Sequence, residues 1–240
     1  MNTMKPMKPM KQIGNNQAGF TLVEIAIVLV IIGLLLGGIL KGQEMITQAK
    51  IKNIVNDMNG MSAAIYSYQD RYRALPGDEL NATTTGRWGA AAFGGDGNGT
   101  LCRGPCEGPP LVANAYNIVP ADPTSGTTEA SLFWMHLRLS GFVPGPTAGL
   151  ASVQQPANAV NGILGVQTTG MGFTSNIICS SNLPDKVAIA VDTQVDDGTS
   201  TTGGIRGQLQ SAPSPVPAAA APTATYVENG TNQYLICKNL

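Results

Sequence analysis

The first long feature of the sequence is an almost unbroken apolar run. From Phe20 to Leu40 the only charged residue is Glu24. A helix needs about 20 such residues to cross the hydrocarbon core of a bilayer. The leader before the run has no acidic residue and holds three lysines, Lys5, Lys8 and Lys11. Because positive charges beside a span stay on the cytoplasmic side, we expect a transmembrane helix at residues 20–41 with its N-terminus in the cytoplasm.

Beyond Lys41 the apolar residues form a single stripe. They recur at alternating spacings of three and four, which places them on one face of a helix, at Ile51, Ile54, Met58, Met61, Ile65, Tyr68 and Tyr72. No proline occurs between Phe20 and Leu75, and Pro76 cannot continue a helix. We therefore expect one long helix whose amphipathic half, residues 42–75, packs on a sheet. A coiled coil is the alternative.

Residues 76–240 are expected to form the globular head of an α+β protein, with the long helix packed on a small antiparallel sheet. The pattern predicts a loop-rich stretch to about residue 127 and a short amphipathic helix at residues 128–139. The predicted strands cover residues 162–168, 187–193 and 233–240, and the last two fit an antiparallel sheet. The Pro/Ala-rich residues 211–225 should form an exposed, extended linker.

Four cysteines follow the apolar run, at Cys102, Cys106, Cys179 and Cys237. An even number in a segment that looks exported suggests two disulfides. Cys102 and Cys106 lie in the sequence CRGPC, where Gly and Pro can turn the chain and close a small loop. Cys179 then pairs with Cys237. A zinc site is the alternative, but four cysteine ligands usually come as two close pairs, and only one pair is close here.

Charge and motif content argue against two classes of function, nucleic-acid binding and catalysis. The chain has 14 Lys and Arg residues against 15 Asp and Glu residues, and only 12% of its residues are charged. Without a basic face, nucleic acid is not expected as a partner. The chain has one histidine, His136, and neither a Gly-X-Ser-X-Gly nor a His-Glu-X-X-His motif. We therefore expect no enzyme, and we expect His136 to be a surface or core residue of its helix.

Glu24 distinguishes the apolar run from a plain membrane anchor. An ionised carboxylate inside a membrane is costly, so such residues are rare, usually paired and usually functional. In a plain membrane anchor, the cation that pairs with Glu24 would be a lysine of the leader whose side chain reaches the membrane interface. If the chain is cut after Gly19, the new amino group of Phe20 is a cation that Glu24 can neutralise. The pair can form within one chain or between neighbouring chains.

The sequence of residues 19–24, GFTLVE, resembles the processing site of type IV prepilins, a family that includes the pseudopilins of type II secretion. The family pattern is a basic leader that ends in Gly, then Phe-Thr-Leu-(Ile/Val)-Glu and an apolar helix. All of these features are present, although the leader of residues 1–19 is longer than in most pseudopilins. The resemblance implies that a prepilin peptidase cuts after Gly19 and methylates Phe20. It also implies that Glu24 meets the N-terminus of an adjacent subunit during filament assembly.

The same resemblance implies a pilin-like fold and a structural role in a type IV pilus or a type II secretion pseudopilus. Its partners would be other pilin or pseudopilin subunits, the prepilin peptidase, the inner membrane and the assembly platform. The head would lie in the periplasm and then on a filament at the cell surface. A minor pilin that acts as an adhesin or a DNA-uptake module is the alternative.

Two acidic segments are candidates for calcium. By the resemblance the better one is Asp192, Asp196 and Asp197, because some major pseudopilins hold calcium in a C-terminal acidic loop; a solvated hairpin turn is the alternative. The other segment begins at Asp96, and its first residues have the ligand spacing of a calcium-binding loop. Its sixth position is Leu101, where that loop needs glycine. Turn residues are expected there, and no other cofactor is expected.

Overall fold

The computed structural model describes residues 21–90, 92–102, 116, 129–211 and 216–240. The chain divides into two compact units, Met1–Met45 and Ile46–Leu240. The first holds the apolar run and the second holds the head. Helix α1 (Leu22–Tyr72) contributes residues to both units, and it confirms the long proline-free helix that the sequence predicts. The helix ends before Pro76, where Arg73 takes a positive φ of 56° and its N–H donates to the carbonyl of Gln69.

The head contains a four-stranded antiparallel sheet in the order β1-β2-β4-β3. Its strands are β1 (Leu164–Gly170), β2 (Phe173–Pro184), β3 (Ile205–Leu209) and β4 (Gln233–Asn239). Strands β1 and β2 form a hairpin whose turn residues, Met171 and Gly172, both have positive φ. The structure confirms the predicted α+β class. It adds β2 and β3, which the sequence reading missed.

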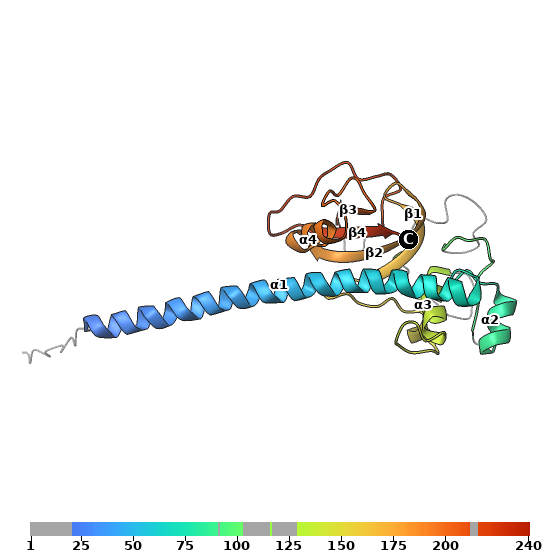
Figure 1. Cartoon of the computed structure of the whole chain (residues 1–240), viewed down its shortest axis with the longest axis horizontal. Coiled ribbons are helices and arrows are strands. Elements are labelled where there is room, and N and C mark those ends of the chain that lie inside the picture. The colour runs from blue at the N-terminus through green and yellow to red at the C-terminus, as the bar shows by residue number, and fades with distance from the viewer. Residues whose placement is uncertain (1–20, 91, 103–115, 117–128, 212–215) are drawn as a thin grey trace, which may run out of the picture. The chain divides into compact units, whose positions relative to one another are not determined.

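The second half of α1 runs along one face of the sheet (Figure 1), and the apolar stripe of the helix packs there with residues of the strands. Ile51, Ile54 and Met58 pack in one buried cluster with residues of the sheet, including Ile236 of β4. Further along the helix a second cluster joins the stripe to β1 and β2 through Met61, Ile65, Tyr68, Leu164, Val166 and Ile178. The stripe is therefore a core seam, as expected, and the coiled-coil alternative is not needed to cover it.

The short helices of the head were predicted in part. Helix α3 (Glu129–Leu139) confirms the amphipathic helix expected at residues 128–139, and almost all of its side chains are buried. Helix α2 (Asn81–Trp88) lies in the stretch expected to be loop. A single 3₁₀ turn, η1, covers Leu150–Ser152.

The strand predicted at residues 187–193 was wrong, because this segment belongs to helix α4 (Asp185–Val195). Its sequence is a short apolar run, which by pattern alone fits a buried strand as well as a helix. Val187, Ala188 and Val191 are buried in one cluster with residues of the sheet and of the α1 stripe, and their spacing of one and four residues is that of a helix face. Tertiary packing therefore selected the helix.

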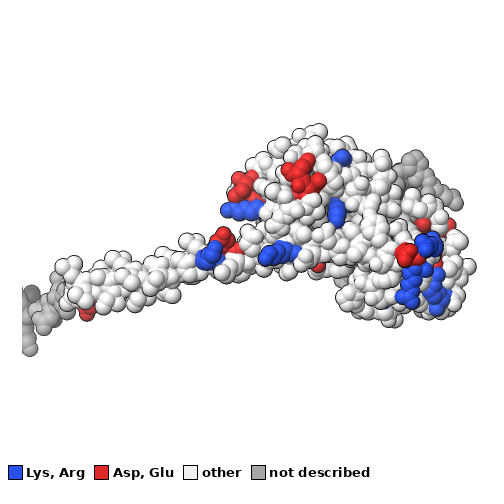
Figure 2. All heavy atoms as spheres, in the orientation of Figure 1, with Lys and Arg blue, Asp and Glu red and all other residues white. Residues whose placement is uncertain are grey.

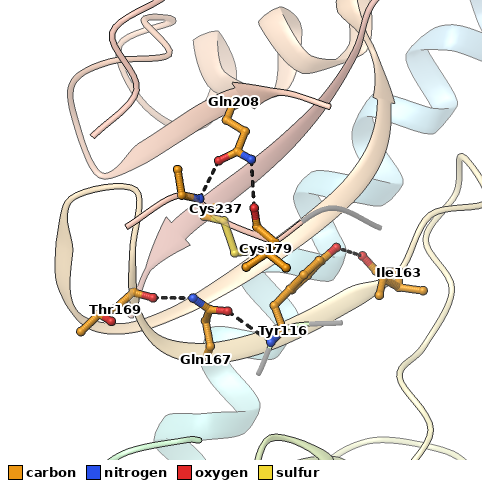
Figure 3. Close-up of a disulfide and its surroundings, with 9 residues drawn as sticks. Tyr116, Ile163, Gln167, Thr169, Cys179, Gln208 and Cys237 are labelled. Atoms are coloured by element: carbon orange, nitrogen blue, oxygen red, sulfur yellow. Dashed lines mark hydrogen bonds between the residues drawn. A yellow bond between two sulfur atoms is a disulfide. The ribbon is translucent and has the colours of Figure 1, made fainter. Parts of the chain in front are cut away.

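The opposite face of the sheet carries the disulfide between Cys179 and Cys237, which confirms this predicted pair. The two residues lie directly opposite each other on β2 and β4. Figure 3 shows the ring of Tyr116 beside them, with its hydroxyl donating to the carbonyl of Ile163 (3.0 Å). The predicted Cys102–Cys106 pair remains a prediction, because Cys106 lies outside the described residues.

The described part of the Pro/Ala-rich segment, residues 216–225, has no helix or strand and is mostly exposed. Hydrogen bonds nevertheless attach it to the sheet. The carbonyls of Ala218 and Ala219 accept from the N–H groups of Met171 and Gly172 in the β1–β2 turn. The side chain of Gln208 on β3 bonds the backbone of Val216 and Ala218.

We predict that replacing both Cys179 and Cys237 by alanine lowers the free energy of unfolding of the head by about 4 kcal/mol, as expected for a bridge across a loop of this size. The bridge joins residues that are 58 positions apart. Denaturant unfolding followed by the near-UV signal of the head measures the effect. An unchanged midpoint in the double variant would contradict the structural role of the bridge.

Candidate functional site

Glu24 lies in the first turn of α1 and forms a reciprocal cap with Thr21. The backbone N–H and the hydroxyl of Thr21 both donate to Oε2 of Glu24, each at 2.8 Å. In return, the N–H of Glu24 donates to Oγ1 of Thr21 at 3.3 Å. This Thr-X-X-Glu arrangement is a capping box, which satisfies two free N–H groups of a helix start. The sequence reading did not identify Thr21 as a partner of Glu24, although the spacing itself is a capping signature.

Among the described residues Glu24 takes part in no salt bridge. Its carboxylate therefore has hydrogen bonds but no cation in this part of the chain. The predicted cut site, Gly19 and Phe20, lies outside the described residues together with the rest of residues 1–19. The processing and assembly roles of Gly19, Phe20 and Glu24 remain predictions.

The surface around Glu24 is apolar and uncovered. Leu22 is 91% exposed and Leu34 is 74% exposed, and large apolar side chains continue on all sides of the helix to Leu40. A soluble protein rarely exposes an apolar patch of this extent. Within the described residues α1 is the one helix that is long and apolar enough to cross a membrane. A carboxylate on such a surface favours contact with a cation from outside the helix.

Four positions in this half of α1 are glycine and so carry no side chain: Gly33, Gly37, Gly38 and Gly42. At each of them, no heavy atom lies within 4 Å of the position that a Cβ would take. Nothing in the described chain therefore requires glycine there. Small residues on a membrane helix allow another helix to approach closely.

A second set of polar side chains is buried in the head where α1, α2 and α3 meet. Glu79 accepts two hydrogen bonds from Arg87 (2.8 and 2.7 Å) and one from the hydroxyl of Tyr68 (2.6 Å). Burial by itself would raise the pKa of Glu79, but the hydrogen bonds from Arg87 and Tyr68 lower it below its ordinary value. The group stays ionised and joins α2 to α1.

His136 lies next to this network and is fully buried. Its Nδ1 accepts from the N–H of Gly77 (2.8 Å), so its Nε2 donates to the carbonyl of Phe93 (2.7 Å). The neutral imidazole therefore connects α3 to two loops. Burial lowers the pKa of His136 to about 4. This placement agrees with the core position that the sequence left open for His136, and it gives the residue a structural role.

Within the described part of the chain, two groups of carboxylates converge closely enough to hold a cation. The first is Asp192, Asp196 and Asp197, the better calcium candidate of the sequence analysis, and one carboxylate oxygen of each lies within 4.8 Å of the others. Asp192 is buried and accepts from the hydroxyl of Tyr226 (2.7 Å) and from the N–H of Gly198 (3.2 Å). Burial raises the pKa of Asp192, and the charges of Asp197 and Asp196 raise it further. The two hydrogen bonds act in the opposite direction, but the pKa stays above its ordinary value.

The other group is Asp78, Asp96 and Glu129, which the sequence reading did not bring together. Asp96 and Asn98 make local turns, as expected, because their side chains accept from the N–H groups two residues ahead. Asp78 accepts from the N–H groups of residues 97–99, and Asp96 donates its own N–H to Glu129. Burial raises the pKa of Glu129 to about 8. No local sequence pattern could have indicated this group, because its three carboxylates come from separate segments of the chain.

We predict that the head loses stability as the pH falls from about 6.5 to about 4, in part because of His136. Over this range the unfolded chain binds a proton at the imidazole and the folded chain does not, so stability is fully present above pH 6.5. The loss from this group is up to roughly 3 kcal/mol. The variant His136→Gln should be less stable at neutral pH and should lack this part of the pH dependence. Parallel pH profiles of unfolding free energy in the two proteins would contradict the assignment.

Comparison with curated proteins and with solved structures found no match. One protein family matches the chain, at residues 14–40, and it is described as the prokaryotic N-terminal methylation motif. The match covers the end of the leader, the predicted cut site, the capping box of Glu24 and most of the exposed apolar run. The chain thus carries at its N-terminus the methylation motif that is the signature of type IV prepilins and pseudopilins.

Proposed function

We propose that this protein is a structural subunit of a type IV pilus or of a type II secretion pseudopilus. The methylation motif includes most of an apolar run whose one carboxylate, Glu24, has no cation among the described residues. This combination carries the proposal. The motif supports a pilin-like precursor rather than an enzyme.

In this proposal a prepilin peptidase cuts after Gly19, and the new amino group of Phe20 is methylated. The cut places a cation four residues before Glu24, at the start of the mature chain. Attraction between opposite charges is strong where water is absent. The amino group of a neighbouring copy therefore pairs with Glu24 as the apolar helices come together, and this pair sets the register of the subunits.

Before that pairing, the carboxylate of Glu24 is held by the hydrogen bonds of the capping box. Two hydrogen bonds from Thr21 hold Oε2 of Glu24 at the helix start. Each carboxylate oxygen has more than one acceptor position. Glu24 can therefore keep its cap and accept an ammonium group at the same time, so assembly does not require the first turn to unfold.

The head suits an exported subunit. Its disulfide forms and persists in an oxidising compartment such as the periplasm. With the N-terminus in the cytoplasm, the apolar helix crosses the inner membrane and leaves the head outside. The proposed partners are other pilin subunits, the prepilin peptidase and the assembly platform that extracts subunits from the membrane.

We also propose that Asp192, Asp196 and Asp197 bind calcium. Carboxylate oxygens are the ligands that Ca²⁺ prefers. The support is their convergence within 4.8 Å beside the start of β3, where Asp196 already accepts from the N–H of Ile205 (2.9 Å). A bound cation would offset the repulsion among the three charges and fix the loop that joins α4 to β3.

Replacing Glu24 by alanine should leave the chain cleaved and in the membrane, and it should reduce its incorporation into filaments by at least about tenfold, because the pairing of opposite charges is lost. Filaments sheared from cells and probed for this chain give the measurement. Glu44→Ala is the matched control, because Glu44 is an exposed acid further along α1 that pairs with Lys41 of its own chain. Normal assembly of the Glu24 variant would overturn the proposal.

Calcium at about one hundred times its dissociation constant should stabilise the head by about 2.7 kcal/mol. Thermal unfolding with and without a chelator measures this effect. The double variant Asp196→Asn with Asp197→Asn should not respond. If it responds like the natural chain, the calcium site is elsewhere, and the variant Glu129→Gln then tests the second carboxylate group.

A further inference from the structure

Three tripeptides of the head have the sequence Asn-X-Thr. They cover residues 81–83, 98–100 and 229–231, and X is not proline in any of them. In chains that are exported across a membrane, this tripeptide is the acceptor of N-linked sugar, which bonds to Nδ2 of the asparagine. All three asparagines are exposed, so exposure does not distinguish them. Their hydrogen bonds do.

Asn98 lies in a turn that places its threonine against its side chain. Both the N–H and the hydroxyl of Thr100 donate to Oδ1 of Asn98. The turn is anchored on its inner side, because Asp78 is buried and accepts from the N–H groups of Asn98 (3.0 Å) and Gly99 (2.8 Å). An enzyme that recognises an asparagine together with the hydroxyl two residues ahead therefore meets both groups already adjacent on an exposed turn.

A carboxylate holds the other end of the same amide. Nδ2 of Asn98 donates to Oδ2 of Asp96 at 2.9 Å, which is within the reach of a general base. An amide nitrogen is a weak nucleophile, because its lone pair is shared with the carbonyl. A carboxylate at the N–H raises the electron density on nitrogen, and a hydroxyl at Oδ1 stabilises the negative charge that moves to oxygen. The two contacts therefore polarise the amide of Asn98 in the direction that makes Nδ2 reactive.

The other two asparagines lack this combination. Asn229 makes the same turn with Thr231, but a valine lies two residues before it and, among the described residues, no acceptor bonds its Nδ2. Asn81 begins α2, and its Oδ1 accepts from the N–H of Gly94 (3.0 Å) instead of from a threonine. Of the three acceptor tripeptides, the one at Asn98 thus has both the hydroxyl and the carboxylate in place.

A carboxylate in this position is not a general feature of the surface. Charged residues make up only 12% of the chain, and they are sparse on the face of the head shown in Figure 2. Among the described residues Asp96 takes part in no salt bridge. No lysine or arginine of this part of the chain therefore competes with Nδ2 of Asn98 for the oxygens of Asp96.

We propose that Asn98 is the acceptor of an N-linked oligosaccharide, which an enzyme transfers from a lipid diphosphate carrier. Nδ2 of Asn98 bonds to C1 of the first sugar. The bond between C1 and the diphosphate breaks, and the lipid diphosphate leaves with the electron pair of that bond. The proton that Nδ2 loses passes to a carboxylate, and Asp96 is within reach of it. No oxidant or reductant takes part.

The modification requires only that the head is exported. The inference therefore rests on the exported head of the proposed function, but it does not rest on filament assembly. It goes beyond that function, because an oligosaccharide is a bulky, hydrated group that changes the surface which the head presents at this turn.

The natural chain gives the first test. Full-length protein is purified from the membranes of the cells that make it, digested, and analysed by mass spectrometry with fragmentation that keeps the sugar on its peptide. The fraction modified should be at least about tenfold higher at Asn98 than at Asn81 or Asn229, because these two lack the carboxylate. Equal modification of the three sites, or an Asn98 that is found only unmodified or deamidated, would overturn the proposal.

Substitutions at Asp96 and Thr100 test the two contacts of Asn98. Asp96→Asn should lower the fraction modified at Asn98 by at least about tenfold, because an amide is not a base. Thr100→Ser keeps the hydroxyl and should be modified like the natural chain, whereas Thr100→Val removes it and should stay unmodified. Formation of the Cys179–Cys237 disulfide shows whether each variant folds. An unchanged fraction in folded Asp96→Asn would refute the assignment.

A gain of modification at Asn229 gives an independent test. Val227 is 53% exposed and lies two residues before Asn229, as Asp96 does before Asn98. Val227→Asp should raise the fraction modified at Asn229 by at least about tenfold, because it supplies the missing carboxylate. Val227→Asn, which has the same size but no charge, is the matched control and should have no effect. Equal modification in these two variants would count against the proposal even if Asp96→Asn does not fold.

The outcomes for this inference and for the proposed function are separate. Filaments whose subunits carry no sugar at Asn98 would overturn the inference alone. Sugar at Asn98 in cells where the chain forms no filaments would overturn the proposed function alone.

Discussion

Burial of the apolar stripe on the second half of α1 is the interaction on which the head depends. Six of its seven side chains are buried, and each fully buried aliphatic or aromatic side chain contributes roughly 1.5–3 kcal/mol. The sheet, α3 and α4 all supply partners for this stripe. Along β4 the residues alternate, so that Tyr234 and Ile236 face α1 while Leu235 and Cys237 face away. The disulfide can therefore connect β2 and β4 on the far face without disturbing the seam.

The first half of the same helix has the opposite environment. Its side chains are apolar on all sides and exposed, so they need a membrane or other helices to cover them. The two halves of one helix thus have different environments. The environment changes where the uniformly apolar run ends and the one-sided apolar stripe begins. Within the uniform part, Glu24 is the one polar group that needs a cation, and its place in a capping box holds it at the helix start.

The polar residues of the head divide by role. Glu79, Arg87 and His136 have hydrogen-bond partners within the fold and connect separate segments. The two carboxylate groups are different, because like charges converge in each of them. Groups of this kind are where external ions or chains gain most from binding.

The sequence by itself determined the features that depend on local order. The long helix, its apolar run and stripe, helix α3, strands β1 and β4 and the motif around Glu24 all follow from spacings within one segment. The Cys179–Cys237 pair also followed, because the other two cysteines, Cys102 and Cys106, lie only four positions apart in the sequence. Tertiary structure decided what depends on distant segments. It made residues 185–195 a helix, because their short apolar run fits the period of a strand as well as that of a helix, and only packing in the core with the sheet and α1 selects one. It also brought together Asp78, Asp96 and Glu129, since no local pattern records which side chains a folded chain makes neighbours.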